Sequence, residues 1–109
     1  MEKGSKFLDI ATIRQLIREE KIQWPGHILI RMHQRGIKIK DVVTSIMSGE
    51  IIEYYEEDYP FPSCLILGFI EENKGLHTVC ALGQGYVWMI TAYYPSLDEW
   101  CEDLKMRRK

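Results

Sequence analysis

The stretch from His27 to Gly36 contains three basic side chains at a spacing that brings them together on a helix. At roughly 100° per residue, His27, Arg31 and Arg35 fall within about 80° of one another, along the edge of an apolar stripe. Imidazole exchanges protons near neutral pH, and guanidinium binds phosphate oxygens through its forked N–H donors. The spacing therefore predicts one wall of a site for an anionic substrate, and Gly36 is placed to end the helix in the left-handed conformation.

A second group of polar side chains lies on the last two expected strands. If residues 83–85 form a three-residue hairpin loop, His77 lies directly opposite Thr91, and Tyr93 lies one diagonal away on the same face. A two-residue loop would instead place Thr91 on the opposite face from His77. The glycines at both ends of the loop favour the three-residue form, which predicts a second wall made of His77, Thr91 and Tyr93.

Together the two groups suit the cleavage of RNA without a metal ion, in which the 2′-hydroxyl attacks the neighbouring phosphate. This reaction needs one group that takes a proton and another that returns it, which are roles for histidine and tyrosine. It also needs cations near the charge that develops on phosphorus, which suits arginine. The candidate catalytic residues are His27, Arg31, Arg35, His77, Thr91 and Tyr93. No metal or cofactor is expected, because the chain has no ligand cluster with metal-binding spacing.

Each candidate also has a plainer structural interpretation. A strand histidine such as His77 is often buried and hydrogen-bonded, and the two arginines can face water or pair with Glu50 or Glu53. Thr91 and Tyr93 favour strands by their shape alone. The aromatic side chains can stack on bases or belong to the core. The rival hypothesis is a catalytically silent module that binds a protein on an open sheet face.

The composition is that of one globular domain over residues 1–109. The formal net charge is −2, which argues against a strongly basic surface for nucleic acid, although basic residues gather at 31–40 and 105–109. Three widely spaced cysteines without a CxxC pair fit a reducing compartment rather than a disulfide framework or a zinc site. No apolar run is long enough to span a bilayer and no signal-like segment opens the chain, so we expect a cytoplasmic protein with no membrane association.

Hydrophobic spacing predicts helices first and strands afterwards. Helical spacing is present in three segments, residues 7–21, 27–35 and 39–47. Strands are expected in four segments, residues 51–56, 64–70, 76–82 and 86–94. Gly49 is expected to stop the third helix, Pro95 to stop the last strand, and Ser96 or Asp98 to cap a last helix. The predicted fold is α+β: N-terminal helices, then a four-stranded antiparallel meander with one face partly open, then a short C-terminal helix.

Several short motifs extend over nearly the whole chain. They are His27-x-x-x-Arg31-Met32-x-x-Arg35-Gly36-Ile37, Gly49-Glu50-Ile51-Ile52-Glu53-Tyr54, Asp58-Tyr59-Pro60-x-Pro62-Ser63-Cys64-Leu65-Ile66-Leu67-Gly68, Leu76-His77-x-Val79, Ile90-Thr91-Ala92-Tyr93-x-Pro95 and Trp100. With these motifs the chain resembles the small bacterial domain-of-unknown-function family numbered 4258. One departure is Leu76, because the family often has proline at that position.

This family is similar to the barnase, EndoU, colicin and RelE group of compact ribonuclease folds. The resemblance implies a toxin-like, metal-independent endoribonuclease of a toxin–antitoxin system. Its implied partners are RNA, in free form or on the ribosome, and a cognate antitoxin protein, and a homodimer is compatible with it. The matching motifs imply the following roles: His77 as acid or base, Arg31 and Arg35 as phosphate binders, His27 and Tyr93 as helpers, and Thr91 as an orienting hydroxyl.

Overall fold

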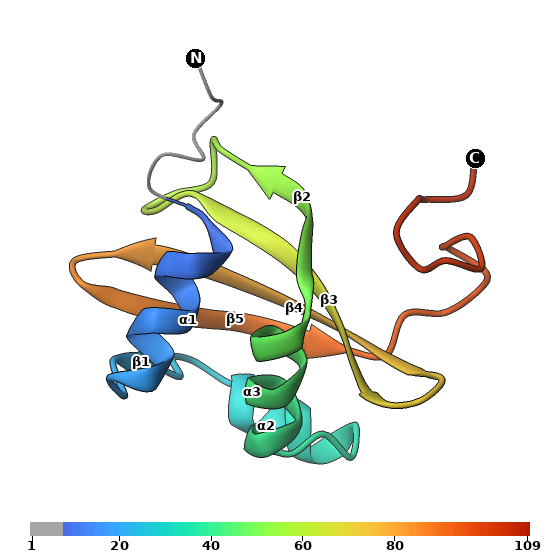
Figure 1. Cartoon of the computed structure of the whole chain (residues 1–109), viewed down its shortest axis with the longest axis horizontal. Coiled ribbons are helices and arrows are strands. Elements are labelled where there is room, and N and C mark those ends of the chain that lie inside the picture. The colour runs from blue at the N-terminus through green and yellow to red at the C-terminus, as the bar shows by residue number, and fades with distance from the viewer. Residues whose placement is uncertain (1–7) are drawn as a thin grey trace.

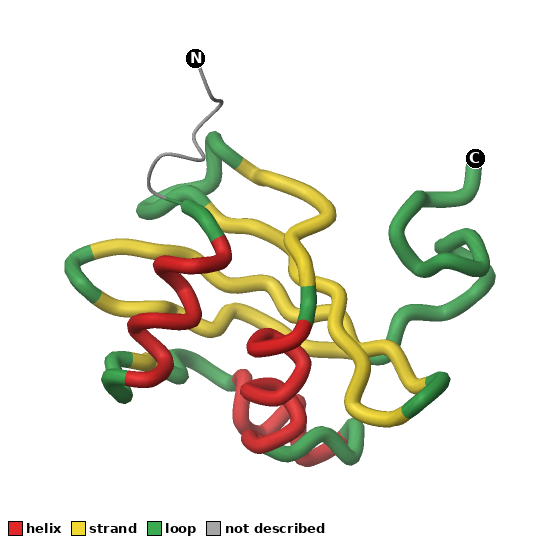
Figure 2. Tube along the Cα trace, in the orientation of Figure 1, coloured by secondary structure: helices red, strands yellow, loops and turns green. Residues whose placement is uncertain are grey.

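Three helices and one five-stranded sheet make up the computed structural model, which describes residues 8–109 (Figure 1, Figure 2). The elements in chain order are α1 (Ile10–Arg18), β1 (Ile22–Gln23), α2 (Ile28–Gln34), α3 (Ile39–Ser48), β2 (Glu50–Tyr55), β3 (Ser63–Glu71), β4 (Lys74–Gly83) and β5 (Tyr86–Tyr93). The strand order is β1-β5-β4-β3-β2. The α+β class is therefore confirmed. Within residues 8–109, no helix has the length and apolar character needed to cross a membrane.

The sheet is mixed rather than purely antiparallel. Strands β2 to β5 form the predicted antiparallel meander, and β1 adds a parallel edge strand to β5. Only two residues of β1 pair, which is too short a stretch for any hydrophobic period to reveal. The first helix is correspondingly shorter than predicted, because Glu20 adopts a φ of +60° and turns the chain into β1. The expected helix start at residue 7 lies outside the part of the chain that the structure describes.

Helix α3 lies against β3 at a distance that only glycine allows. A Cβ on Gly68 would lie 1.9 Å from the carbonyl oxygen of Ser45, and a Cβ on Gly49 would lie 2.4 Å from that of Leu67. Gly49 follows α3 as predicted, but its φ of −98° is extended, so close packing and not a left-handed turn accounts for this glycine. The φ of Gly36 is +72°, which confirms the left-handed end predicted for α2.

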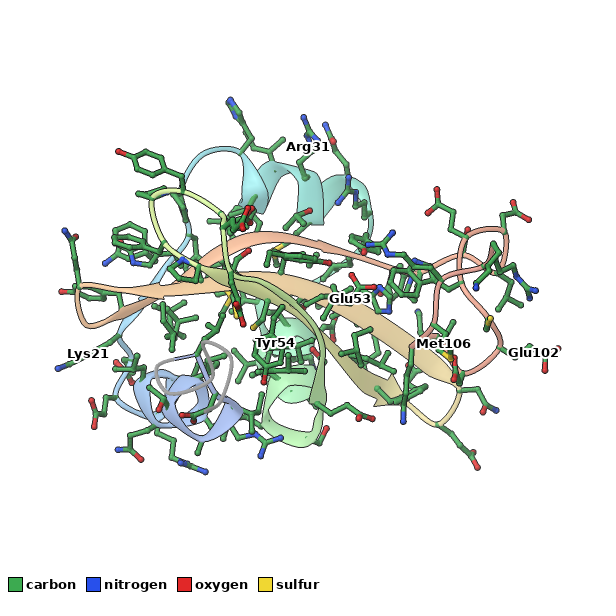
Figure 3. All side chains as sticks on the ribbon, turned by 90° about the horizontal axis from the view of Figure 1, so that it is seen from above. Lys21, Arg31, Glu53, Tyr54, Glu102 and Met106 are labelled. Atoms are coloured by element: carbon green, nitrogen blue, oxygen red, sulfur yellow. The ribbon has the colours of Figure 1, made fainter. Side chains whose placement is uncertain are left out.

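The main core lies between the sheet and the helices. Figure 3 shows α1 and α3 on one side of the sheet and α2 on the other, where α2 lies beside β5. Along β5, Val87 and Met89 belong to this core before Ile90, whereas Ala92 and Tyr94 belong to it afterwards. We call the strand side chains directed away from α1 and α3 the second face. It includes Glu53, Tyr55, Ser63, His77, Trp88, Thr91 and Tyr93.

The predicted C-terminal helix is wrong. Residues 96–109, which we call the C-terminal segment, form turns and one isolated bridge between Trp100 and Arg107 (Figure 2). The Asp103 carboxylate accepts hydrogen bonds from the backbone N–H groups of Lys105 and Met106, which favours a turn over a helix. Trp100 is only 1% exposed, because it packs onto the second face. The C-terminal segment therefore covers the part of the second face around His77, a face that the sequence predicted to be partly open.

Candidate active site

The hairpin between β4 and β5 decides which side chains meet on the second face. Its turn consists of Gln84 and Gly85, with φ values of +56° and +82°. Positive φ at both central positions matches the right-handed twist of the strands, which is why two-residue turns of this kind join antiparallel strands. The predicted three-residue loop is therefore wrong. Taken alone, a two-residue turn moves Thr91 to the opposite face from His77.

An extra residue in β5 reverses this change of face. Met89 and Thr91 pair with two adjacent residues of β4, Cys80 and Val79, so Ile90 has no partner across the ladder. Such a β-bulge changes the phase of the inside–outside alternation by one residue. The side chains that follow Ile90 thus return to the face that the three-residue loop predicted for them.

His77, Thr91 and Tyr93 consequently share the second face, as predicted. Their register differs, because Tyr93 and not Thr91 lies directly opposite His77. The direct pairing brings the imidazole and the phenol into hydrogen-bond contact, with 3.2 Å between His77 Nδ1 and Tyr93 Oη. The sequence grouped the right residues but assigned the closest contact to the wrong one.

Both ring nitrogens of His77 are bonded inside the protein. Nε2 lies 2.9 Å from the carbonyl oxygen of Leu104, and a carbonyl only accepts, so Nε2 carries the hydrogen. Nδ1 is then the acceptor, and the Tyr93 hydroxyl donates to it. The imidazole is 0% exposed and meets Trp100 edge-on, with 4.5 Å between ring centroids. The surroundings thus fix both the tautomer and the orientation of His77.

Burial keeps this pair uncharged. It lowers the pKa of His77, an effect that the hydrogen bond to Leu104 opposes in part. Burial also raises the pKa of the Tyr93 phenol. The pair therefore consists of a neutral imidazole and a neutral phenol at pH 7, an arrangement through which one proton can pass.

Arg35 joins α2 to β5 beside this pair. Its Nη1 donates to the carbonyl oxygen of Ala92 at 2.8 Å and to Thr91 Oγ1 at 3.3 Å. Thr91 thus connects the basic helix to the strand that carries Tyr93. Arg31 makes no such bond within residues 8–109. It is exposed on α2, on the side of the sheet away from α1 and α3 (Figure 3).

A cleft of about 400 Å³ lies between α2 and β5. Its lining residues are Pro25, Gly26, His27, Ile28, Arg31, Met89, Ile90 and Thr91. Five of the six predicted residues thus form two adjacent groups, and Arg35, the sixth, lies between them. His27, Arg31 and Thr91 share the cleft, while His77 and Tyr93 form the hydrogen-bonded pair farther along β5.

A carboxylate network that the sequence analysis missed lies next to His77. Glu53 accepts two hydrogen bonds from Arg107, both at 3.0 Å, and one from the Tyr55 hydroxyl at 2.6 Å. Arg107 also lies over the Trp100 ring, 4.6 Å from its centroid. Its guanidinium holds the pKa of Glu53 below the usual value, against the effect of burial. This network fastens the C-terminal segment to β2.

The acidic side of this network was foreseeable, whereas the basic side was not. Glu53 and Tyr55 are two residues apart on one strand, so alternation alone directs both to the same face. The proposed pairing of these acids with the helix arginines does not occur, because Glu50 binds Lys105 at 2.9 Å and Glu53 binds Arg107. No period or motif in the basic tail indicated that it would return to β2.

Metal-binding groups are dispersed over the described chain. Nowhere in residues 8–109 do three His, Cys, Asp or Glu side chains lie close enough to hold a metal ion. Cys64 and Cys80 are opposite each other on β3 and β4, both as buried free thiols. They face α1 and α3 and belong to the main core, on the other side of the sheet from the His77–Tyr93 pair.

The fold and the site define an α+β domain with a group of polar side chains on the second face, beside a basic helix. The family model described as "Domain of unknown function (DUF4258)" matches residues 24–94, which is more than half of the chain, so the protein belongs to this family. All six predicted site residues lie within the match, and the C-terminal segment lies outside it. The chain matches no curated protein and no solved structure.

Proposed function

We propose that this protein is a toxin-like, metal-independent endoribonuclease that cleaves RNA by attack of the 2′-hydroxyl on the neighbouring phosphate. The observation that carries the proposal is the hydrogen-bonded His77–Tyr93 pair beside a cleft that presents Arg31 and His27. A neutral proton-accepting pair on one side and cations on the other are the two requirements of this reaction.

In the proposed reaction each side chain has one task. Tyr93 takes the proton of the 2′-hydroxyl while passing its own to Nδ1 of His77, so His77 acts through Tyr93. The 2′-oxygen attacks phosphorus, and the 5′-oxygen leaves with a proton from His27. Arg31 binds the phosphate oxygens, and the Thr91 hydroxyl orients them. Arg35 holds this hydroxyl in place by donating a hydrogen bond to Oγ1. The products are a 2′,3′-cyclic phosphate and a 5′-hydroxyl end.

The proposal includes a setting for this chemistry. A net charge of −2 gives no general electrostatic attraction to RNA, which favours a substrate presented on the ribosome over free RNA. A cognate antitoxin, a cytoplasmic location and a fold of the barnase and RelE group are parts of the same proposal. A homodimer is compatible with it.

Expression in a bacterium tests the proposal. We expect the wild-type protein to slow growth and to leave RNA fragments with cyclic phosphate ends, and we expect Arg31→Ala and His27→Ala to restore growth by at least about tenfold in colony count. His33→Ala is the matched control for His27→Ala, because His33 is an exposed histidine on the same helix outside the cleft. Equal growth and intact RNA in all four strains would refute the ribonuclease.

One observation favours a second candidate, a catalytically silent module that binds a protein. Both nitrogens of His77 are bonded internally and the ring is fully buried, as expected for a structural histidine. This candidate predicts that all four strains grow alike and that the purified protein leaves RNA intact in the presence and in the absence of divalent cations.

A further inference from the structure

A second cavity adjoins the cleft of His27 and Arg31 on the second face. It has a volume of about 580 Å³, and Pro25 and Ile90 line both cavities, so the two are adjacent. Three of its nine lining residues are aromatic: Tyr59, Phe61 and Trp88. We call it the aromatic cavity, and it lies next to the basic cleft.

We propose that the aromatic cavity binds an unpaired base of RNA, with guanine preferred, while the neighbouring phosphate lies in the cleft of Arg31. This inference rests on the proposed function for its substrate class and adds the site that selects the base. Flat aromatic side chains bind unpaired bases by stacking, and basic side chains nearby hold the backbone.

The dimensions agree with one nucleotide step. Trp88 lines the aromatic cavity and Thr91 lines the basic cleft, and both lie on β5. Their partners on β4, Ala81 and Val79, are only two residues apart because of the bulge, so at about 3.3 Å per residue roughly 7 Å of strand separates them. This distance matches the reach from a base to the phosphate of its neighbour. Ile90, which is exposed at the bulge, lies between the two cavities and contributes an apolar surface for the ribose.

Two of the aromatic side chains are held by contacts with their neighbours, and a third is exposed to solvent. Trp88 Nε1 donates to the carbonyl oxygen of Gly83 at 2.9 Å, and the Trp88 ring lies 5.9 Å from that of Phe61. The cavity therefore has a fixed wall before any ligand arrives. Tyr59 is 94% exposed, which is unusual for so large an aromatic side chain. An exposed tyrosine ring at this position is available to stack on a base.

The charges of the two cavities are opposite. Among the described residues that line the aromatic cavity, Asp58 is the only charged one. A carboxylate repels phosphate, so the base and not the backbone belongs here, with the phosphate at Arg31. Asp58 is oriented by the Ser63 hydroxyl, which donates to its Oδ2, and the carboxylate retains further lone pairs.

The carboxylate also sets the preference for guanine. The Watson–Crick edge of guanine offers two adjacent N–H donors, which suit the two oxygens of Asp58. The single N–H donor of uracil lies between two carbonyl oxygens, which the carboxylate repels. We therefore expect discrimination between these bases to depend on Asp58, and affinity for either base to depend on Tyr59.

Binding of short 2′-O-methyl oligouridines, with and without one central guanine, tests this site by fluorescence anisotropy. These oligonucleotides lack the attacking 2′-hydroxyl, so binding is measured apart from cleavage. We expect the guanine oligonucleotide to bind the wild type about tenfold more tightly than oligouridine. Tyr59→Ala weakens its binding about tenfold, and Asp58→Asn removes the preference for guanine.

Tyr54→Ala is the matched control, because Tyr54 is an exposed tyrosine whose strand partner, Cys64, belongs to the main core on the other side of the sheet. The base site is refuted if the wild type binds neither oligonucleotide, or if Tyr59→Ala binds as Tyr54→Ala does. If the protein cleaves cellular RNA but Tyr59→Ala does not weaken oligonucleotide binding, the base site is refuted and the proposed ribonuclease activity is not. If the protein binds the guanine oligonucleotide preferentially but cleaves no RNA, the ribonuclease activity is refuted and the base site is not.

Discussion

His77 combines features of a structural and of a chemical histidine. Its ring is fully buried, like a core residue, yet its hydrogen bonds select one tautomer and align it with a phenol. A purely structural imidazole needs only satisfied nitrogens, whereas the Tyr93 hydroxyl supplies a group that can exchange its proton. In the proposed reaction, substitution of His77 alone changes both stability and chemistry, which is why the matched pair His27 and His33 gives the sharper activity test.

Stability should depend on pH through His77. Burial lowers its pKa from the ordinary value of 6.5, so below that pH the unfolded chain binds more protons than the folded one. The free energy of unfolding is then unaffected by this group above pH 6.5 and falls as the pH decreases below it. Arg107 lowers the pKa of Glu53 from 4.5. The stability that this carboxylate contributes is therefore lost only as the pH falls below about 4.5.

Urea unfolding at several pH values between about 5 and 8 measures this dependence. His77→Gln, which keeps a polar but non-titrating side chain, is expected to flatten the curve above pH 5, whatever its effect on stability at neutral pH. His33→Gln is the control and retains the wild-type slope. An unchanged slope in His77→Gln would mean that another group titrates.

At the scale of elements, the C-terminal segment is held mainly by one side chain. Trp100 is 1% exposed and packs against His77, while the ion pair of Arg107 with Glu53 is partly exposed. Exposed ion pairs contribute little, and a buried tryptophan contributes much. The segment thus depends on packing more than on charge.

Trp100→Ala is therefore expected to lower the free energy of unfolding by about 3–5 kcal/mol. Leu97→Ala, at a side chain that is 54% exposed in the same segment, is expected to change it by less than about 0.5 kcal/mol. Urea unfolding of both variants gives the comparison. Similar values for the two would show that the segment does not pack on the sheet in solution.

Sequence patterns located the long elements because each carries a full hydrophobic period. Helix α3 and strand β3 are found within a residue or two of their predicted bounds. The register of β5 was not predictable, because a two-residue turn and a bulge at Ile90 shift it in ways that leave the apolar pattern almost unaltered. The prediction that His77, Thr91 and Tyr93 share one face is still correct, because the shorter turn and the bulge each move these β5 side chains to the opposite face and so cancel.

At the scale of the whole molecule, charge is arranged locally. The chain is slightly acidic, yet its basic cleft and the cavity that contains Asp58 lie side by side on the second face. The family match spans residues 24–94 and so contains both cavities, while the cover over His77 comes from residues beyond it. The sequence predicted the candidate residues within residues 24–94. It did not predict that the C-terminal segment covers His77, because no motif or hydrophobic period in that segment indicates it.

Such an arrangement predicts a shallow salt dependence of RNA binding. With one or two cationic contacts, the slope of log affinity against log salt for a single strand is about −1, since each contact contributes about −0.7. Anisotropy with the guanine oligonucleotide at several salt concentrations measures it. Arg31→Ala is expected to bring the slope closer to zero. Lys40 is also exposed in the basic region, and Lys40→Ala is expected to leave the slope unchanged. A slope steeper than about −4 would require an extended basic surface instead.

The bulge at Ile90 makes the site depend on the length of the chain more than on the identity of one side chain. Ile90 has no partner across the ladder, so Ile90→Val leaves the register intact. Deletion of the same residue turns Thr91 and Tyr93 toward the hydrophobic core and Ala92 outward, although every chemical group is still present. In this fold, a lost codon between Met89 and Thr91 is therefore a far more damaging event than a changed one.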